Sequence, residues 1–252
     1  MKTIFISGTA GSGKSLLTSK LLEYYTSNGA FAAALNLDPG VENLPYECDV
    51  DVRDFVDVVS IMKQYDLGPN GALIMANDLI ASKCNDLQTE IGGVNPDYLI
   101  VDTPGQIELF AYRSSGKFLV DNLATEEKTN IFLFDGALVT EPLNFISIAL
   151  LAASIRLRLN LPALSVMTKT DLIGDRTKDI QEWSSNHAAL EAAVSGAADG
   201  DTYSLTMAIL RGLDYTEMVQ GLIPVSNVTG EGLVSLEAAL SRILNLGEEV
   251  ED

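Results

Sequence analysis

The feature that most constrains the fold of this chain is a glycine-rich turn between an apolar run and a helical pattern. Residues 8–15 read GTAGSGKS and fit G-x-x-x-x-G-K-[ST], directly after the apolar run at residues 3–7. A strand that turns straight into a helix places backbone N–H groups around phosphate oxygens. Lys14 offers a cation to the β and γ phosphates, and the Ser15 hydroxyl can bind Mg²⁺. We therefore expect phosphates to be bound by Gly11, Ser12, Gly13, Lys14, Ser15 and Leu16.

Short apolar runs alternate with longer helical patterns along the rest of the chain. This alternation is typical of βαβ units. It predicts an α/β fold in which a mostly parallel sheet carries helices on both faces, with helical insertions. Strands are expected at residues 3–7, 31–38, 98–102, 131–135, 163–168 and 222–226, and helices at residues 15–27, 78–92, 142–159 and 235–246.

The simplest organisation is a single domain over residues 1–252. Residues 174–220 contain few large apolar side chains, so we expect a helical insertion or a mobile lid outside the sheet core. The longest apolar stretch, residues 145–155, is shorter than the about 20 residues that a membrane-spanning helix needs. We interpret it as a core helix, and we expect no membrane binding. The helical spacing is shown by Ile146, Leu150, Ala153 and Leu157.

A second candidate part of the phosphate site follows another apolar run. Residues 99–105 read LIVDTPG, a strand that ends in Asp102 and a turn. A carboxylate at the end of a strand beside the phosphate-binding turn can hold Mg²⁺, directly or through water. The backbone N–H of Gly105 is expected to face the γ-phosphate. We therefore predict Asp102 and Ser15 as metal ligands.

A third motif predicts which base is bound. Residues 168–171 read TKTD and follow the expected strand at residues 163–168. The Asp171 carboxylate can accept from both N1–H and the 2-amino group of guanine, while the Lys169 stem covers the ring. Adenine would leave this carboxylate unpaired, so the motif favours GTP over ATP. Residues after the last strand, Ser226, Asn227 and Val228, can offer backbone N–H groups to the guanine carbonyl.

The charge balance excludes other classes of partner. The chain has 16 Lys and Arg against 35 Asp and Glu, a net charge of −19. Such a chain repels phosphate backbones and anionic lipids, so we expect no binding to nucleic acid or membrane by bulk charge. Two cysteines, Cys48 and Cys84, with no secretory signal, fit a reducing compartment, so we expect a cytoplasmic protein.

These motifs, in this order, resemble the P-loop GTPases over nearly the whole chain. Residues 66–71, DLGPNG, are similar to the insertion that names the GPN-loop GTPases, and residues 36–40, NLDPG, and 102–108, DTPGQIE, also match that family. The chain resembles an archaeal-type, single-domain member. Family members usually have Ala at the position of Gly40, which is a local departure.

The resemblance implies a three-layer P-loop NTPase fold, GTP and GDP as ligands with Mg²⁺, and GTPase activity. It also implies a homodimer with facing sites, each completed by the partner's GPN loop. Asn70 in that loop has an amide that can donate to a phosphate oxygen. Hydrolysis would change the helical lid near the interface, as a molecular switch.

The catalytic candidates come from the same resemblance. Asp38 is expected near the metal and the attacking water, as an outer-shell group or as a base. Gln106 and Glu108 are candidates for positioning that water, because phosphoryl transfer depends mainly on placement and charge stabilisation. The sequence does not rank them. Lys14 and Asn70 complete the catalytic set.

Two other functions remain open at this stage. The first is a nucleotide-dependent scaffold or assembly chaperone with slow hydrolysis, since eukaryotic relatives are associated with RNA polymerase assembly and could indicate protein partners by analogy. The second is an ATP-dependent metal-insertion or partition protein. Those proteins typically carry an additional lysine early in the phosphate loop, which is absent between Gly8 and Gly13.

Overall fold

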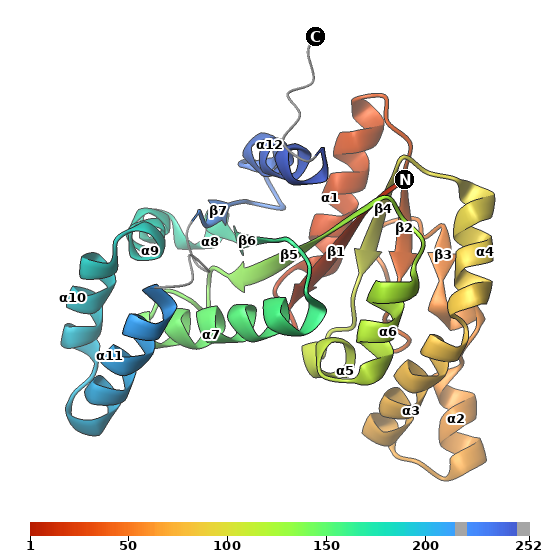
Figure 1. The fold of residues 1–252 in the computed structure, drawn as a ribbon, viewed down its shortest axis with the longest axis horizontal. Coiled ribbons are helices and arrows are strands. Elements are labelled where there is room, and N and C mark those ends of the chain that lie inside the picture. The colour runs from red at the N-terminus through yellow and green to blue at the C-terminus, as the bar shows by residue number, and fades with distance from the viewer. Residues whose placement is uncertain (215–220, 246–252) are drawn as a thin grey trace. The chain divides into compact units, whose positions relative to one another are not determined.

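A computed structural model describes residues 1–214 and 221–245 of the chain. It contains two compact units, the first made of residues 1–130 and 158–162 and the second of residues 131–157 and 163–252, so far as these are described. Figure 1 shows strands followed by helices in both. The organisation as a single domain stays a prediction.

The sheet of the first unit brings several strand ends together. Its strands are β1 (Lys2–Gly8), β2 (Ala32–Asn36), β3 (Val50–Asp51) and β4 (Tyr98–Asp102), in the order β3-β2-β4-β1. All the pairings described are parallel, and Asp102 is in register with both Ile6 and Asn36. The carboxyl ends of three strands therefore meet at one edge of the sheet, which is where ligands bind in such folds.

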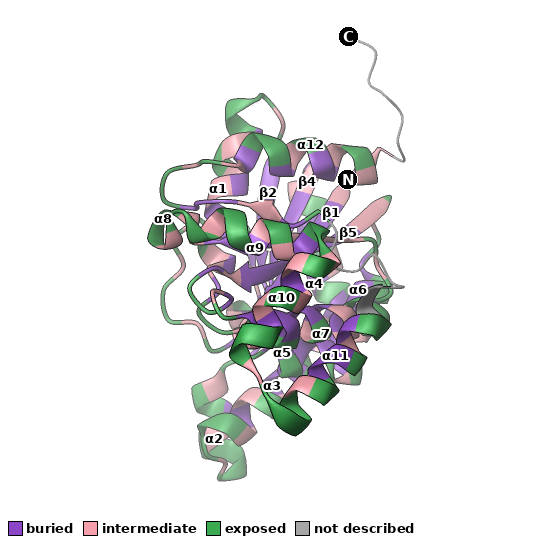
Figure 2. Ribbon diagram, turned by 90° about the vertical axis from the view of Figure 1, so that its left-hand side faces the viewer, coloured by how far each residue is buried: buried purple, intermediate pink, exposed green. Residues whose placement is uncertain are grey.

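Helices cover both faces of this sheet. Helix α1 (Lys14–Ser27) stacks Tyr25 on Tyr98 of β4, with 4.1 Å between the ring centroids. Helix α5 (Ile107–Ala111) stacks Phe110 on Phe5 of β1 at 6.2 Å. Lys2 is in register with Tyr98, and Phe5 lies three residues further along, so the two ring pairs lie on opposite faces. Figure 2 shows the strands between them as buried. The predicted α/β fold with a parallel sheet is confirmed.

The region between β3 and β4 differs from the prediction. A short 3-10 turn (Val52–Asp54) precedes α2 (Val58–Tyr65), α3 (Pro69–Ser82) and α4 (Cys84–Val94). The single helix predicted at residues 78–92 is wrong, because the chain leaves the helical conformation at Lys83. Apolar side chains keep helical spacing across this break, so periodicity alone could not reveal it. The buried positions are Ala76, Ile80, Cys84, Leu87 and Ile91.

The second unit holds most of the remaining elements. Strand β5 (Glu127–Asp135) starts in the first unit and ends in the second, where β6 (Ala163–Thr168) pairs in parallel with β7 (Ile223–Pro224). In the first unit helix α6 (Ser114–Asn122) contacts α3 and α5, and in the second unit helix α12 (Leu233–Leu244) contacts β6. The bounds of β6 match the prediction. Residue 246 of the predicted last helix lies outside the described residues.

Residues 174–214 contain three helices that are separated by short non-helical breaks. They form α9 (Arg176–Ser185), α10 (His187–Ala197) and α11 (Gly200–Asp214), after the single turn α8 (Thr170–Ile173). Residues 215–220 of the predicted insertion lie outside the described part. A lid movement of these helices stays a prediction.

Helix α7 (Pro142–Leu159) has the predicted bounds. Among the described helices it alone is long and apolar enough to cross a membrane, by length and composition. However, Phe145, Ile148 and Ile155 are buried, and the Phe145 ring lies 5.9 Å from that of Phe134 and 6.0 Å from that of Trp183. These contacts support the interpretation as a core helix.

Candidate functional site

The glycine-rich turn adopts the conformation that its sequence predicts. Gly11 and Gly13 have φ of 76° and 92°, in the left-handed region that favours glycine. Gly13 caps α1, which begins at Lys14. The turn thus passes from β1 into a helix N-terminus within a few residues, as phosphate binding requires.

Lys14 is a buried cation inside this turn. Its Nζ donates to the carbonyl oxygens of Gly8 (3.2 Å) and Thr9 (3.1 Å), and the side chain is almost fully buried. Burial lowers the pKa of Lys14, against the attraction of the Asp102 and Asp38 carboxylates. The ammonium group is therefore poorly solvated, and a bound anion would stabilise its charge.

Asp102 ends β4 beside this cation. It is only 2% exposed, and its Oδ2 accepts a hydrogen bond of 3.0 Å from the Tyr46 hydroxyl. Its Oδ1 is buried and has no hydrogen-bond partner among the described residues. Burial raises the pKa of Asp102, although the hydroxyls of Ser15 and Tyr46 and the charge of Lys14 oppose the rise. A buried carboxylate of this kind is stabilised by a nearby cation.

Asp38 lies on the loop after β2, at the same edge of the sheet. Its Oδ1 accepts from the Gly40 N–H and its Oδ2 from the Gly105 N–H, both at 2.9 Å. The Gly105 N–H, which was expected to face the γ-phosphate, thus donates to Asp38 in this structure. Asp38 and the turn after β4 are thus connected directly by a hydrogen bond, while the catalytic role of Asp38 stays a prediction.

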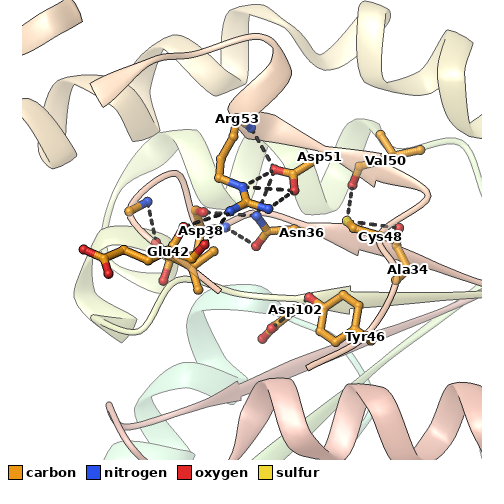
Figure 3. A network of polar contacts seen from close by, with 12 residues as sticks. Ala34, Asn36, Asp38, Glu42, Tyr46, Cys48, Val50, Asp51, Arg53 and Asp102 are labelled. Atoms are coloured by element: carbon orange, nitrogen blue, oxygen red, sulfur yellow. Dashed lines mark hydrogen bonds and ion pairs between the residues drawn. The ribbon is translucent and has the colours of Figure 1, made fainter. Parts of the chain in front are cut away.

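A polar network holds the loop that carries Asp38 (Figure 3). Asn36 accepts from the Asp38 N–H (3.0 Å) and donates to Asp51 Oδ1 (3.0 Å). Arg53 donates to both Asp51 oxygens, at 2.7 Å from Nη2 and 3.0 Å from Nε, and its Nη1 donates to the carbonyl oxygens of Val41 (3.0 Å) and Glu42 (3.3 Å). Strand β3 and the 3-10 turn therefore clamp the loop.

Tyr46, Asp51 and Arg53 were not among the predicted site residues. Strand β3 has only two residues, too few to show alternation. The only available signal was the charged run at residues 49–54, DVDVRD, in which Val50 and Val52 are the only apolar residues. Such a run is more often a solvated surface loop.

A cavity of about 350 Å³ joins these parts of the first unit. It contains most of the predicted phosphate and metal residues. Ser12 is buried nearby in the turn but does not line it. Gln106 and Glu108 are exposed at the start of α5 and are not among the lining residues. The lining consists of Gly11, Gly13, Lys14, Ser15, Leu16, Asp38, Val41, Pro45, Asp102, Thr103 and Gly105.

The residues present fit a magnesium ion. In the described part of the chain no group of three or more His, Cys, Asp and Glu side chains could hold a metal alone. Mg²⁺ at a phosphate site needs few protein ligands, because phosphate oxygens and waters complete its shell. The unpaired Oδ1 of Asp102 and the Ser15 hydroxyl suit this role, whereas both Asp38 oxygens already accept backbone N–H groups.

The predicted base-binding residues lie in the second unit. Asp171 is exposed, and its Oδ1 accepts a 2.7 Å hydrogen bond from the Ser226 hydroxyl. Lys169, with φ of 59°, forms a 2.7 Å ion pair with Asp135. The structure therefore brings Asp171 and Ser226 together and adds Asp135, which was not predicted. Asn227 is buried, and Val228 is 71% exposed.

The GPN tripeptide begins a helix instead of forming a projecting loop. Gly68 is the N-cap of α3 and Pro69 is its first residue, a position that suits proline because its missing N–H would have no helical partner. Asn70 is exposed and does not line the cavity described above. Its amide is available to a second molecule.

Known proteins are similar to this chain over nearly its whole length. A family described as a conserved hypothetical ATP-binding protein matches residues 6–246. GPN-loop GTPase 1 of Schizosaccharomyces pombe is 32% identical over 98% of this chain and 70% of its own length. GPN-loop GTPase 3 of Debaryomyces hansenii is 31% identical over 97% and 91%. The chain belongs to the GPN-loop GTPase family.

A solved structure supports the same fold for this GPN-loop GTPase. The apo form of a GTPase from Pyrococcus abyssi superimposes with a TM-score of 0.83 and 29% identity, covering 96% of this chain and 97% of that one. The predicted family, P-loop fold and enzyme class are thus confirmed. The chain spans only 60% of the length of GPN-loop GTPase QQT2 of Arabidopsis thaliana.

Proposed function

We propose that this chain binds GTP with Mg²⁺ at the phosphate-binding turn and hydrolyses it. The observation that carries the proposal is the buried Asp102 carboxylate, whose Oδ1 has no hydrogen-bond partner among the described residues, in a cavity shared with Lys14. A buried anion and a buried cation that are both poorly solvated suit a ligand that supplies charge of both signs. Polyphosphate with a divalent cation has that chemistry.

Guanine is the proposed base. The description of the matched family mentions ATP, whereas the named relatives are GTPases. Asp171 supports guanine, because its carboxylate can accept two hydrogen bonds from the guanine edge, and Ser226 already donates to it. Lys169 is held beside Asp135, so its stem has a defined position for covering the ring.

Hydrolysis is proposed to proceed by positioning. Asp38 is the candidate that lines the cavity, and each of its oxygens retains a lone pair after accepting one backbone N–H. These lone pairs can orient an attacking water, while Lys14 stabilises charge on the transferred phosphoryl group. When bound, Mg²⁺ would supply Lewis-acid stabilisation of the phosphate oxygens, held by Ser15 and Asp102. Gln106 and Glu108 stay as candidates that would need to approach from α5.

We further propose a cytoplasmic homodimer that acts as a molecular switch or assembly factor. Asn70 lies exposed at the start of α3 and outside the cavity of its own chain, which suits a contribution to the site of a second copy. Protein partners, in RNA polymerase assembly by analogy with relatives, would read the nucleotide state. The alternative is a scaffold that binds nucleotide with slow hydrolysis.

The purified protein tests the enzymatic proposal. With GTP and Mg²⁺ it should release phosphate, and ATP should compete weakly with GTP. Tight GTP binding without phosphate release above background would instead support the scaffold. Equal competition by ATP would contradict the proposed base selectivity.

Mixing two impaired variants tests whether Asn70 contributes to the site of the partner chain. Asn70→Ala should lower turnover and leave nucleotide affinity largely unchanged, whereas Lys14→Met should strongly weaken phosphate binding and leave its own site inactive. In a mixed dimer, the Asn70→Ala chain keeps an intact phosphate site and meets the intact Asn70 of its partner. Turnover should therefore return on mixing. Normal turnover of Asn70→Ala alone, or no recovery in proven mixed dimers, would contradict the trans role.

A further inference from the structure

Tyr46 contacts Asp102, the proposed metal ligand. It lies on the loop between β2 and β3, and its hydroxyl donates to Asp102 Oδ2 at 3.0 Å (Figure 3). The same loop begins with Asp38 and lines the cavity through Val41 and Pro45. None of the motifs that identify the family assigns a role to this contact.

We infer that Tyr46 is a positioning residue for the divalent cation. By donating to Oδ2 it holds the Asp102 carboxylate in one orientation, so that Oδ1 is the oxygen left for the metal beside Ser15. The inference rests on the proposed binding of Mg²⁺. A carboxylate has two equivalent oxygens, and a fixed donor at one of them removes that ambiguity.

The two oxygens of Asp102 differ in the way that this role requires. Oδ2 has a hydrogen-bond donor, while Oδ1 is buried and has no hydrogen-bond partner among the described residues. An unpaired buried carboxylate oxygen is unfavourable, so its presence in a ligand cavity indicates a partner that binds there. Water-rich Mg²⁺ shells accept such an oxygen directly or through a water.

A phenol suits this position better than a cationic donor. A phenol hydroxyl is an uncharged hydrogen-bond donor, and this one donates to Asp102 Oδ2. It therefore gives a hydrogen bond without neutralising the carboxylate, whose full charge stays available to a cation. A lysine or arginine at this place would compete electrostatically with the metal.

The loop on both sides of Tyr46 is anchored, which fixes the hydroxyl. Before it, the Ser19 hydroxyl of α1 donates to the Pro45 carbonyl oxygen at 3.1 Å. After it, the Cys48 thiol donates to the Val50 carbonyl oxygen at 3.1 Å. These contacts come from α1, which starts at the phosphate-binding turn, and from β3. The hydroxyl is thus placed by the same scaffold that places Ser15.

Release of a fluorescent GDP analogue tests the inference, measured in saturating Mg²⁺ and in excess EDTA. For the wild type, Mg²⁺ should slow release. Tyr46→Phe removes only the hydroxyl. The ratio of the release rate in EDTA to that in Mg²⁺ should therefore be about tenfold smaller than in the wild type, as expected for losing one hydrogen bond to a charged group. Release in EDTA should be unchanged. Tyr24→Phe, which removes a tyrosine hydroxyl from helix α1, should behave like the wild type.

The outcomes separate the inference from the proposed function. If Mg²⁺ does not change the rate at which the wild type releases the GDP analogue, the proposed metal site itself would be overturned. A wild type that responds to Mg²⁺, together with a Tyr46→Phe variant that responds equally, would overturn only the role of Tyr46. Equal acceleration in Mg²⁺ and in EDTA would also overturn it, because that pattern reports general loosening.

A second variant guards against poor folding of Tyr46→Phe. Ser19→Ala removes the anchor before Tyr46 and leaves the hydroxyl itself in place. It should accelerate release selectively in Mg²⁺, by less than Tyr46→Phe. Titration of the GDP complex with Mn²⁺, followed by electron paramagnetic resonance, should show weaker metal binding in the same order. Unchanged Mn²⁺ affinity in both variants would count against the inference.

Discussion

The charged groups of the phosphate region in the first unit and of the base region in the second differ in their burial and in their pairing. Asp102 and Lys14 are almost fully buried, and Asp102 keeps one oxygen without a hydrogen-bond partner in the described chain. Asp171 is exposed and paired with Ser226, and Lys169 is paired with Asp135. The phosphate region therefore holds unfavourable burial that a ligand would relieve, whereas the base region holds satisfied groups that must exchange partners.

This difference predicts different consequences for substitutions. Removing a poorly solvated charge should weaken binding without weakening the fold. Removing an exposed, paired carboxylate should change which base is preferred.

Lys14→Met should have the largest effect on binding. Loss of the charge-assisted hydrogen bonds to phosphate should weaken GDP binding about a hundredfold. Because burial dominates the lowered pKa of Lys14, the nucleotide-free variant should melt at the same temperature as the wild type or higher. Calorimetric titration and thermal melting measure the two quantities. Lys20→Met, which removes an ammonium paired with Glu23 on the same helix, is the matched control. A large fall in melting temperature would contradict the conclusion that the burial of Lys14 is unfavourable for the fold.

Asp171→Asn should change base preference in the second region. It should weaken GTP binding about thirtyfold, because an amide cannot accept both guanine donors. Xanthosine triphosphate should bind more tightly to Asp171→Asn than to the wild type, since its additional carbonyl can accept from the amide. Competition binding measures both affinities, with Asp175→Asn as the control four residues away. An unchanged base preference would remove Asp171 from the proposed base site.

Arg53→Ala tests the clamp around Asp38. Loss of its bonds to Asp51, Val41 and Glu42 should lower the free energy of unfolding by about 1.5 kcal/mol, a value reduced for partial exposure to solvent. Urea unfolding measures it. Arg113→Ala breaks the more exposed pair with Asp78 and should have a smaller effect. An equal loss of unfolding free energy in both variants would show that the contacts of Arg53 with the loop add no stability beyond that of an exposed ion pair.

The pH dependence of that loss has a definite sign. Burial alone would raise the pKa of Asp51, but the hydrogen bonds from Arg53 and Asn36 and the charge of Arg53 together outweigh burial, so the pKa is lowered. The stabilisation is therefore complete above the unfolded value of about 4 and disappears as the pH falls through the lower folded value. The difference between the wild type and Arg53→Ala should shrink in that acidic range. A difference that stays constant would mean that Asp51 is not the partner that matters.

Contiguous motifs account for what the sequence could predict. The turn at residues 8–15 and the strand ending in Asp102 each combine a local pattern with a defined place in the fold, and both meet at the cavity. Helix α7 and strand β6 have the predicted bounds. Each of these features depends on residues that are neighbours in the sequence.

Features that depend on distant contacts were missed. The stripe chosen for α7 included Leu150 and Leu157, which are exposed, while Phe145, Ile148 and Ile155 are buried. Since α7 is apolar on more than one face, periodicity could not choose the buried face. The contact of Tyr46 with Asp102 joins residues 56 positions apart. No local pattern reports such a pair.

Gly40→Ala should have the smallest effect and tests how tightly the loop after Asp38 packs on α3. A Cβ at this position would lie 2.7 Å from Leu73 Cδ2, the end of a flexible side chain. Displacing Leu73 opposes the gain from a less flexible unfolded chain, so the free energy of unfolding should change by less than about 1 kcal/mol. In a Leu73→Val background, which removes the clashing methyl, Gly40→Ala should become stabilising. A double-mutant cycle in urea measures this coupling. Zero coupling would mean that the helix beginning with Pro69 and the loop of Asp38 respond independently, and the α3 contact would then play no part in holding the phosphate region.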